Sequence, residues 1–134
     1  MITYDVCCSQ VIGDIFNLPQ INMTAGETQT VIFNLLTPEG KPFDGADTCE
    51  ANFALVEYHN RLSDPLINKN IEITYDVDGY DNVAIVKFDI NDTLNLAGKY
   101  VYQLSLKSSS GDYDVVGHGF LYLVRNICPS FASA

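Results

Sequence analysis

Apolar and polar residues alternate with a period of two along most of the chain after residue 19. In LNLAGKYVYQLSLKS, residues 94–108, one set of alternate positions is apolar or aromatic: Tyr100, Tyr102, Leu104 and Leu106. The other set is mixed: Val101, Gln103, Ser105 and Lys107. Because successive side chains of a β-strand point to opposite faces of a sheet, this pattern predicts a strand with one face in a core.

Six further runs rich in β-branched and aromatic residues predict strands at 20–24, 29–36, 49–58, 71–76, 83–89 and 115–124. Pro and Gly mark turns between them, as in TPEGKPFDG (37–45), and HNRLSDPLINKN is the longest irregular stretch. No convincing amphipathic helix separates the runs. About seven strands of this kind favour an all-β fold, a sandwich of two antiparallel sheets that each hide one apolar face.

The two ends of the chain do not follow the strand pattern. We therefore expect three segments: an N-terminal arm or short helical segment at 1–18, the sandwich at 19–126 and a C-terminal tail at 127–134. VIGDIF (11–16) is either a helical turn packed on the sandwich or an arm that docks on another chain. The final strand is apolar on both faces, which predicts cover by the other sheet or by a neighbouring subunit. The possible interface residues are Val11, Ile12, Ile15, Phe16, Phe120, Leu121, Tyr122 and Leu123.

Length and charge narrow the class of protein. The 134 residues, 47% hydrophobic, are enough for one domain with a core. With 7 Lys+Arg against 17 Asp+Glu, the net charge of -10 argues against nucleic acid as a partner. The apolar runs are shorter than the roughly 20 residues of a membrane span, and MITYDVCCSQ does not resemble a secretory signal. We expect a protein made in the cytoplasm that does not enter a membrane.

The segment INDTLNLAGKY (90–100) has the features of a corner between two sheets. In Greek-key sandwiches a Tyr near the start of a late strand often bonds an upstream backbone group through its hydroxyl. Tyr100 is the candidate, and Gly98 leaves the chain room to turn. This corner makes the predicted sandwich immunoglobulin-like.

An ordered set of motifs over residues 20–125 resembles a small immunoglobulin-like domain of tailed-phage virion proteins. The set runs from AGET (25–28) and the apolar strand after it, through a Pro/Gly turn, to DTLNLAGKYVY (92–102), a turn with GD and the final strand. The resemblance is to the N-terminal domain of the baseplate upper protein family and to tail and head fibre domains. It implies a virion structural protein of a phage or prophage, made in the bacterial cytoplasm, that assembles with copies of itself or with other virion proteins. Such domains usually continue into a coiled coil or fibre, which this sequence does not show.

The four cysteines and two histidines offer no metal or cofactor motif. Cys7, Cys8, Cys49 and Cys128 form no CxxC pair, and His59 and His118 each stand alone. In an oxidising setting Cys7 or Cys8 could pair with Cys128, and in a reducing compartment all four would be thiols. DVDGYD (76–81) departs from the spacing of an EF-hand and predicts a hairpin turn. We expect no metal and no cofactor.

Two Cys/His pairs are conceivable for nucleophilic catalysis, Cys49 with His59 and Cys128 with His118, but no family-like signature surrounds either. GHGFLY (117–122) lacks the third glycine of a dinucleotide fingerprint. We therefore expect no catalytic residues and no enzyme.

Tyrosines near loops suggest ligand binding as the alternative function. Tyr58, Tyr80 and Tyr113 could line a saccharide or host cell-surface ligand, since flat aromatic side chains suit such ligands. Tyrosine is also common in the loops of plain sandwiches, so the sequence ranks this function second to assembly and predicts no hits on a glycan array.

Overall fold

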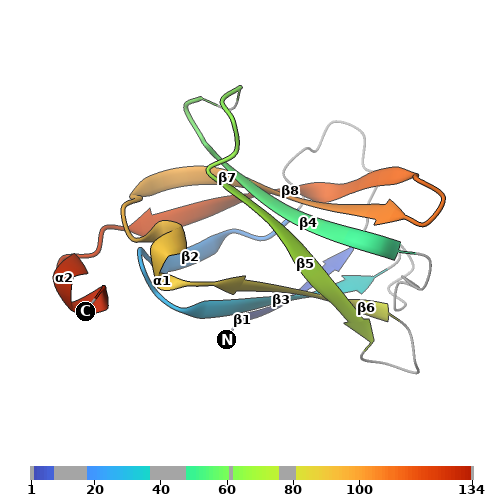
Figure 1. The fold of residues 1–134 in the computed structure, drawn as a ribbon, viewed down its shortest axis with the longest axis horizontal. Helices are drawn as coiled ribbons and strands as arrows, with labels where there is room; N and C mark the ends of the chain where they lie inside the picture. The colour runs from blue at the N-terminus through green and yellow to red at the C-terminus, as the bar shows by residue number, and fades with distance from the viewer. Residues whose placement is uncertain (1, 8–17, 37–47, 61, 76–80, 134) are drawn as a thin grey trace.

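The structure, a computed structural model, describes residues 2–7, 18–36, 48–60, 62–75 and 81–133. These residues form one mixed sheet in the order β1-β3-β6-β5-β4-β7-β8-β2 (Figure 1). The strands are β1 (Ile2–Cys7), β2 (Ile21–Thr24), β3 (Gln29–Leu36), β4 (Thr48–Glu57), β5 (Ile67–Tyr75), β6 (Asp81–Phe88), β7 (Gly98–Ser108) and β8 (Tyr113–Val124). Two single-turn helices, α1 (Ile90–Thr93) and α2 (Pro129–Ala132), complete the described elements.

The sheet curls strongly into a half-barrel because β5 changes its partner along its length. Residues 67–71 of β5 pair with β4, and residues 72–75 pair with β6. The half of the sheet that contains β4, β7, β8 and β2 consequently faces the half that contains β6, β3 and β1 (Figure 1). The predicted sandwich of two separate sheets is not confirmed, although its all-β content is.

The core lies between the two halves and is built from alternate positions of the strands. Val31, Phe33 and Leu35 of β3 and Phe53 and Leu55 of β4 are fully buried. In β7 all four predicted inward residues are buried, namely Tyr100, Tyr102, Leu104 and Leu106. The period-2 pattern therefore predicted the inner face of these strands correctly.

Aromatic rings join the two halves of the sheet. Tyr102 of β7 lies 5.4 Å from Phe53 of β4 and 6.0 Å from Phe33 of β3, between ring centroids. Phe53 meets Phe88 of β6 edge to face at 5.4 Å, and Phe33 stacks with Tyr4 of β1 at 6.0 Å. Contacts of this kind add to the free energy of area burial, so the chain of rings helps to hold the curl.

The structure corrects three predictions about the elements. The sheet is mixed, because β1 pairs with β3 and β2 pairs with β8 in parallel. Residues 2–7 form strand β1, where we predicted an arm or a helical segment. β5 begins at Ile67, inside the stretch that we expected to be irregular. The segment 11–16, with Val11, Ile12, Ile15 and Phe16, and most of the turn at 76–81, with Tyr80, lie outside the described residues.

Candidate functional site

Tyr100 makes the backbone contact expected of a corner residue. Its hydroxyl donates to the Ala97 carbonyl and accepts from the Ala97 N–H, both at 3.0 Å. Its side chain is buried. Gly98 has a φ of 107°, a left-handed conformation that glycine adopts without a steric penalty. The corner is thus closed by one side chain that satisfies two backbone groups.

The AGET turn and the DT pair, far apart in sequence, meet at this end of the molecule. The buried hydroxyl of Thr93 accepts the Gly26 N–H at 2.8 Å. Gly26 has a φ of 84°, and a Cβ on it would lie 2.7 Å from the Leu94 side chain. Asn126, after β8, donates to the Ala25 carbonyl at 2.8 Å. These motif residues therefore have structural roles.

Glycine in the GHG motif makes room for the phenol of Tyr102. Gly119 lies opposite Tyr102 in the β7–β8 ladder, and a Cβ on Gly119 would come within 2.6 Å of the Tyr102 ring. The Tyr102 hydroxyl donates to the Pro19 carbonyl at 2.5 Å. Burial raises the pKa of Tyr102 above its usual range, and the nearby Tyr4 adds to the rise. The GHG motif therefore has a packing role.

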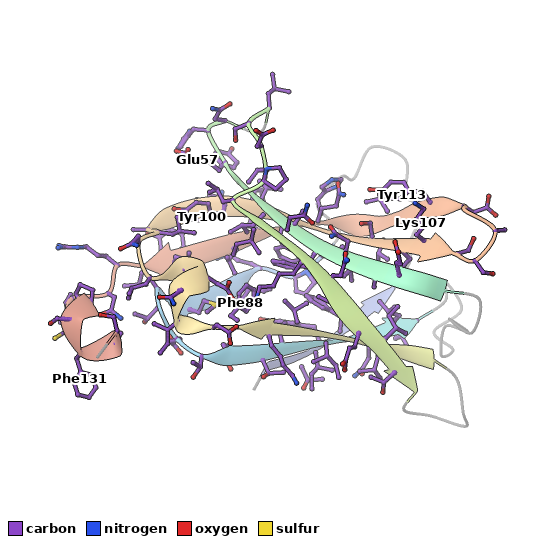
Figure 2. All side chains as sticks on the ribbon, viewed as in Figure 1. Glu57, Phe88, Tyr100, Lys107, Tyr113 and Phe131 are labelled. Carbon is purple, nitrogen blue, oxygen red and sulfur yellow. The ribbon has the colours of Figure 1, made fainter. Side chains whose placement is uncertain are left out.

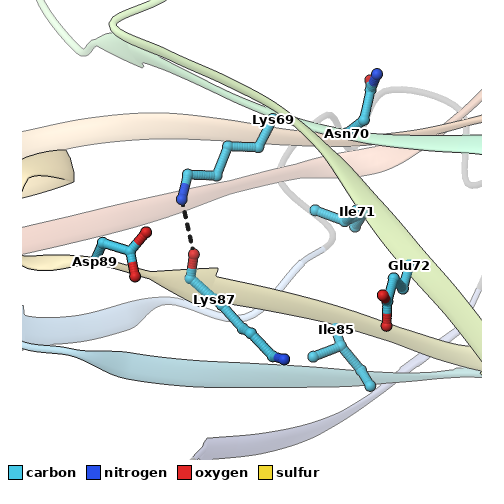
Figure 3. A pocket seen from close by; sticks show the side chains of 7 residues that line it. All are labelled: Lys69, Asn70, Ile71, Glu72, Ile85, Lys87 and Asp89. Carbon is cyan, nitrogen blue, oxygen red and sulfur yellow. Dashed lines mark hydrogen bonds between the residues drawn. The ribbon is translucent and has the colours of Figure 1, made fainter.

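A polar groove of about 280 Å³ follows the place where β5 leaves β6 (Figure 3). Lys69 reaches across it, donating to the Lys87 carbonyl at 2.9 Å and forming an ion pair with Asp92. Asp92 also accepts the Asp89 N–H at 2.7 Å, at the start of α1. The lysine thus links β5, β6 and α1 where the regular ladder is interrupted, which is a structural role for the charges of this groove.

Tyr58 and Tyr113, the two described tyrosines among the three predicted to line a ligand surface, do not form one platform. Tyr58 is half-buried, and the Lys99 ammonium lies 4.6 Å from its ring centroid and 4.1 Å from that of Phe120. Tyr113 lies opposite Lys107 of β7, whereas Glu57, the residue before Tyr58, lies opposite Tyr100 of β7. Lys107 and Tyr100 are seven positions apart, which is roughly 23 Å at the rise of a strand. Figure 2 shows Glu57 and Tyr113 well apart on the sheet.

Tyr113 instead borders a second groove of about 190 Å³ on the outer face of β4, β5, β7 and β8. Its side chain is 60% exposed. The Gln103 side-chain amide donates to the Tyr113 hydroxyl at 3.2 Å, and the Gln103 side-chain oxygen lies 2.9 Å from Nε2 of His118. Sequence reasoning named Tyr113 for a ligand surface and His118 for catalysis, but it did not connect either of them with Gln103, because the register of β7 and β8 brings these residues together.

The predicted interface residues of the last strand divide between core and surface. Leu121 and Leu123 are buried in the core, so they are not available for an interface. Phe120 is half-buried and Tyr122 is exposed, both on the outer face. Residues 121–123 of β8 are also not at a sheet edge, since they pair with both β7 and β2. Beyond β8, Ile127 and Phe131 are 91% and 82% exposed.

The Cys/His pairs considered for catalysis gain no support from the described residues. Cys128 is a free, exposed thiol beyond the end of β8. His118 lies six positions before that end, or about 20 Å along the strand. His59 packs edge-on against Tyr58, and the Cys49 side chain is outside the described set. The described part of the chain holds no group of three His, Cys, Asp or Glu side chains arranged for a metal ion, and no helix in it is long and apolar enough to span a membrane.

Comparison with solved structures identifies a similar fold with a TM-score above 0.5. No family model matches the sequence, and no curated protein does. The chain is similar to the N-terminal domain of phage TP901-1 ORF48, with a TM-score of 0.56 and 11% identity, over 93% of this chain and 100% of that one. CopC from Methylosinus trichosporium OB3b gives a TM-score of 0.46 at 9% identity, over 80% of this chain and 85% of that one. The chain therefore has a β-rich fold like that of a phage protein domain.

Proposed function

We propose that this chain is a non-enzymatic structural protein of a phage or prophage particle, a component of the baseplate, the tail, or a head fibre or decoration. The observation that carries the proposal is the likeness to the phage TP901-1 ORF48 domain over nearly the whole of both chains. The ordered motifs of residues 20–125 support the same assignment. The protein is made in the bacterial cytoplasm and incorporated into the virion.

We further propose that the curled sheet is a variant of the immunoglobulin-like sandwich. The division of β5 between β4 and β6 supports this, because a strand that passes from one sheet to the other would join two sheets into one. The Tyr100 corner supports it as well, since it belongs to Greek-key sandwiches.

Assembly occurs through the apolar end of the molecule formed by the last turn of β8 and the tail. Tyr122, Val124, Ile127 and Phe131 are all exposed there. In Figure 2 Phe131 projects from α2 at one extremity of the molecule. Exposed apolar residues close together are typical of protein interfaces, and the net charge of -10 limits non-specific aggregation. The partner is a second copy of the chain or another virion protein.

Light scattering of the full chain and of the double variant Ile127→Asp/Phe131→Asp tests this surface. We expect the wild type to self-associate with increasing concentration and the variant to be monomeric. Leu62→Asp is the matched control, because Leu62 is 99% exposed in the loop between β4 and β5 and should not affect assembly. Substitutions test this surface better than a truncated chain that lacks residues 1–18, because that truncation would remove strand β1 from the sheet.

A wild-type chain that is monomeric at high concentration would exclude self-assembly. Pull-down with the proteins encoded by neighbouring genes then tests the other partner class. If those genes encode no capsid or tail proteins, the virion assignment is wrong.

A further inference from the structure

We propose that the outer face of β4, β5, β7 and β8 carries a binding site for a neutral saccharide, centred on Tyr113. The site is the groove of about 190 Å³ that Tyr113 borders. Its side chains combine one aromatic ring with groups that can donate and accept hydrogen bonds, the combination that suits a sugar ring with apolar C–H faces and polar hydroxyls. The lining residues used here are Glu50, Asn52, Asn70, Ser105, Lys107 and Tyr113.

The ring of Tyr113 is exposed but held in place. Its hydroxyl is bonded by Gln103, and Gln103 is in turn bonded by the half-buried His118. Exposed side chains usually lose rotamer entropy when a ligand orders them. Here the protein itself orders the ring while leaving it 60% exposed, so a sugar can stack on it at a lower entropic cost.

The same groove holds a buried hydroxyl for which the described residues supply no hydrogen-bond partner. Ser105 is 2% exposed, and within the described part of the chain its hydroxyl makes no hydrogen bond. A buried polar group costs free energy unless it is paired. A hydroxyl can donate and accept, as can the hydroxyl of a sugar, so a bound sugar would satisfy Ser105.

Two asparagines on the neighbouring strands are also preoriented. Nδ2 of Asn52 donates to Oδ1 of Asn68 at 2.7 Å and to Oδ1 of Asn70 at 3.4 Å. These bonds use the Asn52 nitrogen and leave its oxygen as an acceptor, while the Asn70 nitrogen keeps its two donors. The groove therefore offers both kinds of hydrogen-bonding group beside the aromatic ring.

The charges at the groove and on the whole chain favour a neutral ligand over an anionic one. Glu50 and Lys107 pair directly across β4 and β7 and oppose one another at the groove. The net charge of -10 disfavours an anionic saccharide in the surrounding field. The volume is below the roughly 300–1,000 Å³ of sites for larger ligands, which indicates recognition of a short stretch of glycan with weak affinity per site.

This inference departs from the expectation of no glycan binding and does not depend on the proposed virion role. Tyr113 begins β8, whereas the proposed assembly surface lies at and beyond the end of that strand. A chain assembled through the tail would therefore leave the groove open, and several weak sites in one particle would bind a surface with higher avidity.

The test begins with the full chain on an array of neutral and anionic oligosaccharides and continues with NMR titrations of cellobiose, lactose, chitobiose and sialyllactose. We expect at least one neutral probe to shift the side-chain amide signals of Asn52, Asn70 and Gln103. Tyr113→Ala should weaken that binding by about tenfold, as expected for loss of an aromatic contact. Tyr113→Phe keeps the ring but loses the bond from Gln103, and its affinity should be intermediate.

Leu62→Ala is the control, because Leu62 is 99% exposed in the loop between β4 and β5, outside both the groove and the proposed assembly surface, and it should bind like the wild type. Urea unfolding of each variant checks that the fold is retained. The proposal is wrong if no neutral glycan binds, if Tyr113→Ala binds as well as the wild type, or if sialyllactose binds more tightly than the neutral probes.

Discussion

At the scale of single residues, tyrosine hydroxyls hold main-chain segments that no strand ladder satisfies. Tyr4 donates to the Gln20 carbonyl at 3.3 Å, Tyr102 to the Pro19 carbonyl and Tyr100 to the Ala97 carbonyl. In each case the ring packs in or against the core while the hydroxyl reaches a connection between strands. Phenylalanine could supply the packing but not the hydrogen bond, which explains why these positions are tyrosines.

We predict that Tyr100→Phe lowers the free energy of unfolding by about 1 to 3 kcal/mol. The change removes the donor to the Ala97 carbonyl and the acceptor for the Ala97 N–H, while the ring keeps its packing. Urea unfolding measures the effect as a lower midpoint with an unchanged m-value. Tyr122→Phe, at an exposed position, is the control and should leave the midpoint unchanged. Equal midpoints for Tyr100→Phe and the wild type would show that the corner bond contributes no stability.

At the scale of elements, short connections are fixed by contacts between segments distant in sequence. The turn after β2 is held by Thr93 of α1, and the residues after β8 are held to the same turn by Asn126. Helix α1 is too short to be stable alone, so its position depends on these contacts. The AGET and DT motifs are two sides of one interaction.

We predict that Thr93→Val destabilises the fold by about 1 to 3 kcal/mol, because the buried Gly26 N–H loses its acceptor while the side-chain volume is kept. Amide hydrogen exchange should show faster exchange at Gly26 than in the wild type. Thr93→Ser, which retains the hydroxyl, is the control and should preserve the protection of Gly26. Equal protection in the valine variant would mean that another group satisfies this amide.

Strands with strict alternation could be predicted from the sequence, and those with mixed environments could not. QTVIFNLL was predicted at the bounds of β3 because its inward positions are all apolar. β1 was missed although Ile2, Tyr4 and Val6 alternate with polar residues, because the whole segment 1–18 was assigned to an arm or a short helix. The first half of β5 was missed because INKN is polar. The parallel pairing of β1 with β3 and of β2 with β8 depends on contacts between segments distant in sequence, which local patterns do not contain.

The residues of the candidate site also divide into those that the sequence could predict and those that it could not. Tyr113 could be named from the sequence, since an aromatic residue after a Gly-containing turn is expected at the surface. Its neighbours in the groove come from three other strands, and which of them face Tyr113 follows from the register of β4, β5 and β7. Leu121 and Leu123 were assigned to an interface for a related reason. Both faces of their strand are apolar, and only the curl that places the other half of the sheet over one of them distinguishes the buried face.

At the scale of the whole molecule, the half-barrel brings its two edge strands into one connected region. β1 and β2 are at opposite ends of the strand order, yet Tyr4 from β1 and Tyr102 from the other half of the sheet bond the adjacent carbonyls of Gln20 and Pro19. The Leu18 N–H also donates to the His118 carbonyl of β8 at 3.0 Å. Residues 18–20 are therefore a junction at which the curl of the sheet is held.

The buried Tyr102 hydroxyl makes the stability of this junction depend on pH in the alkaline range. Burial raises its pKa in the folded state, so the folded chain keeps the proton that the unfolded chain loses near pH 10. Above that pH the unfolded state binds fewer protons, and stability falls by about 1.4 kcal/mol per pH unit from this group. Below pH 10 both states hold the proton, and the group contributes no pH dependence.

We predict that Tyr102→Phe removes this alkaline loss. The variant is less stable than the wild type at pH 8, because the Pro19 carbonyl loses its donor, but the difference narrows as the pH rises from about 10 to 11. Urea unfolding of both proteins at pH 8, 10 and 11 measures the two free energies. A difference that stays constant across this range would show that the Tyr102 hydroxyl ionises equally in the folded and unfolded chains, and that the junction is open to water.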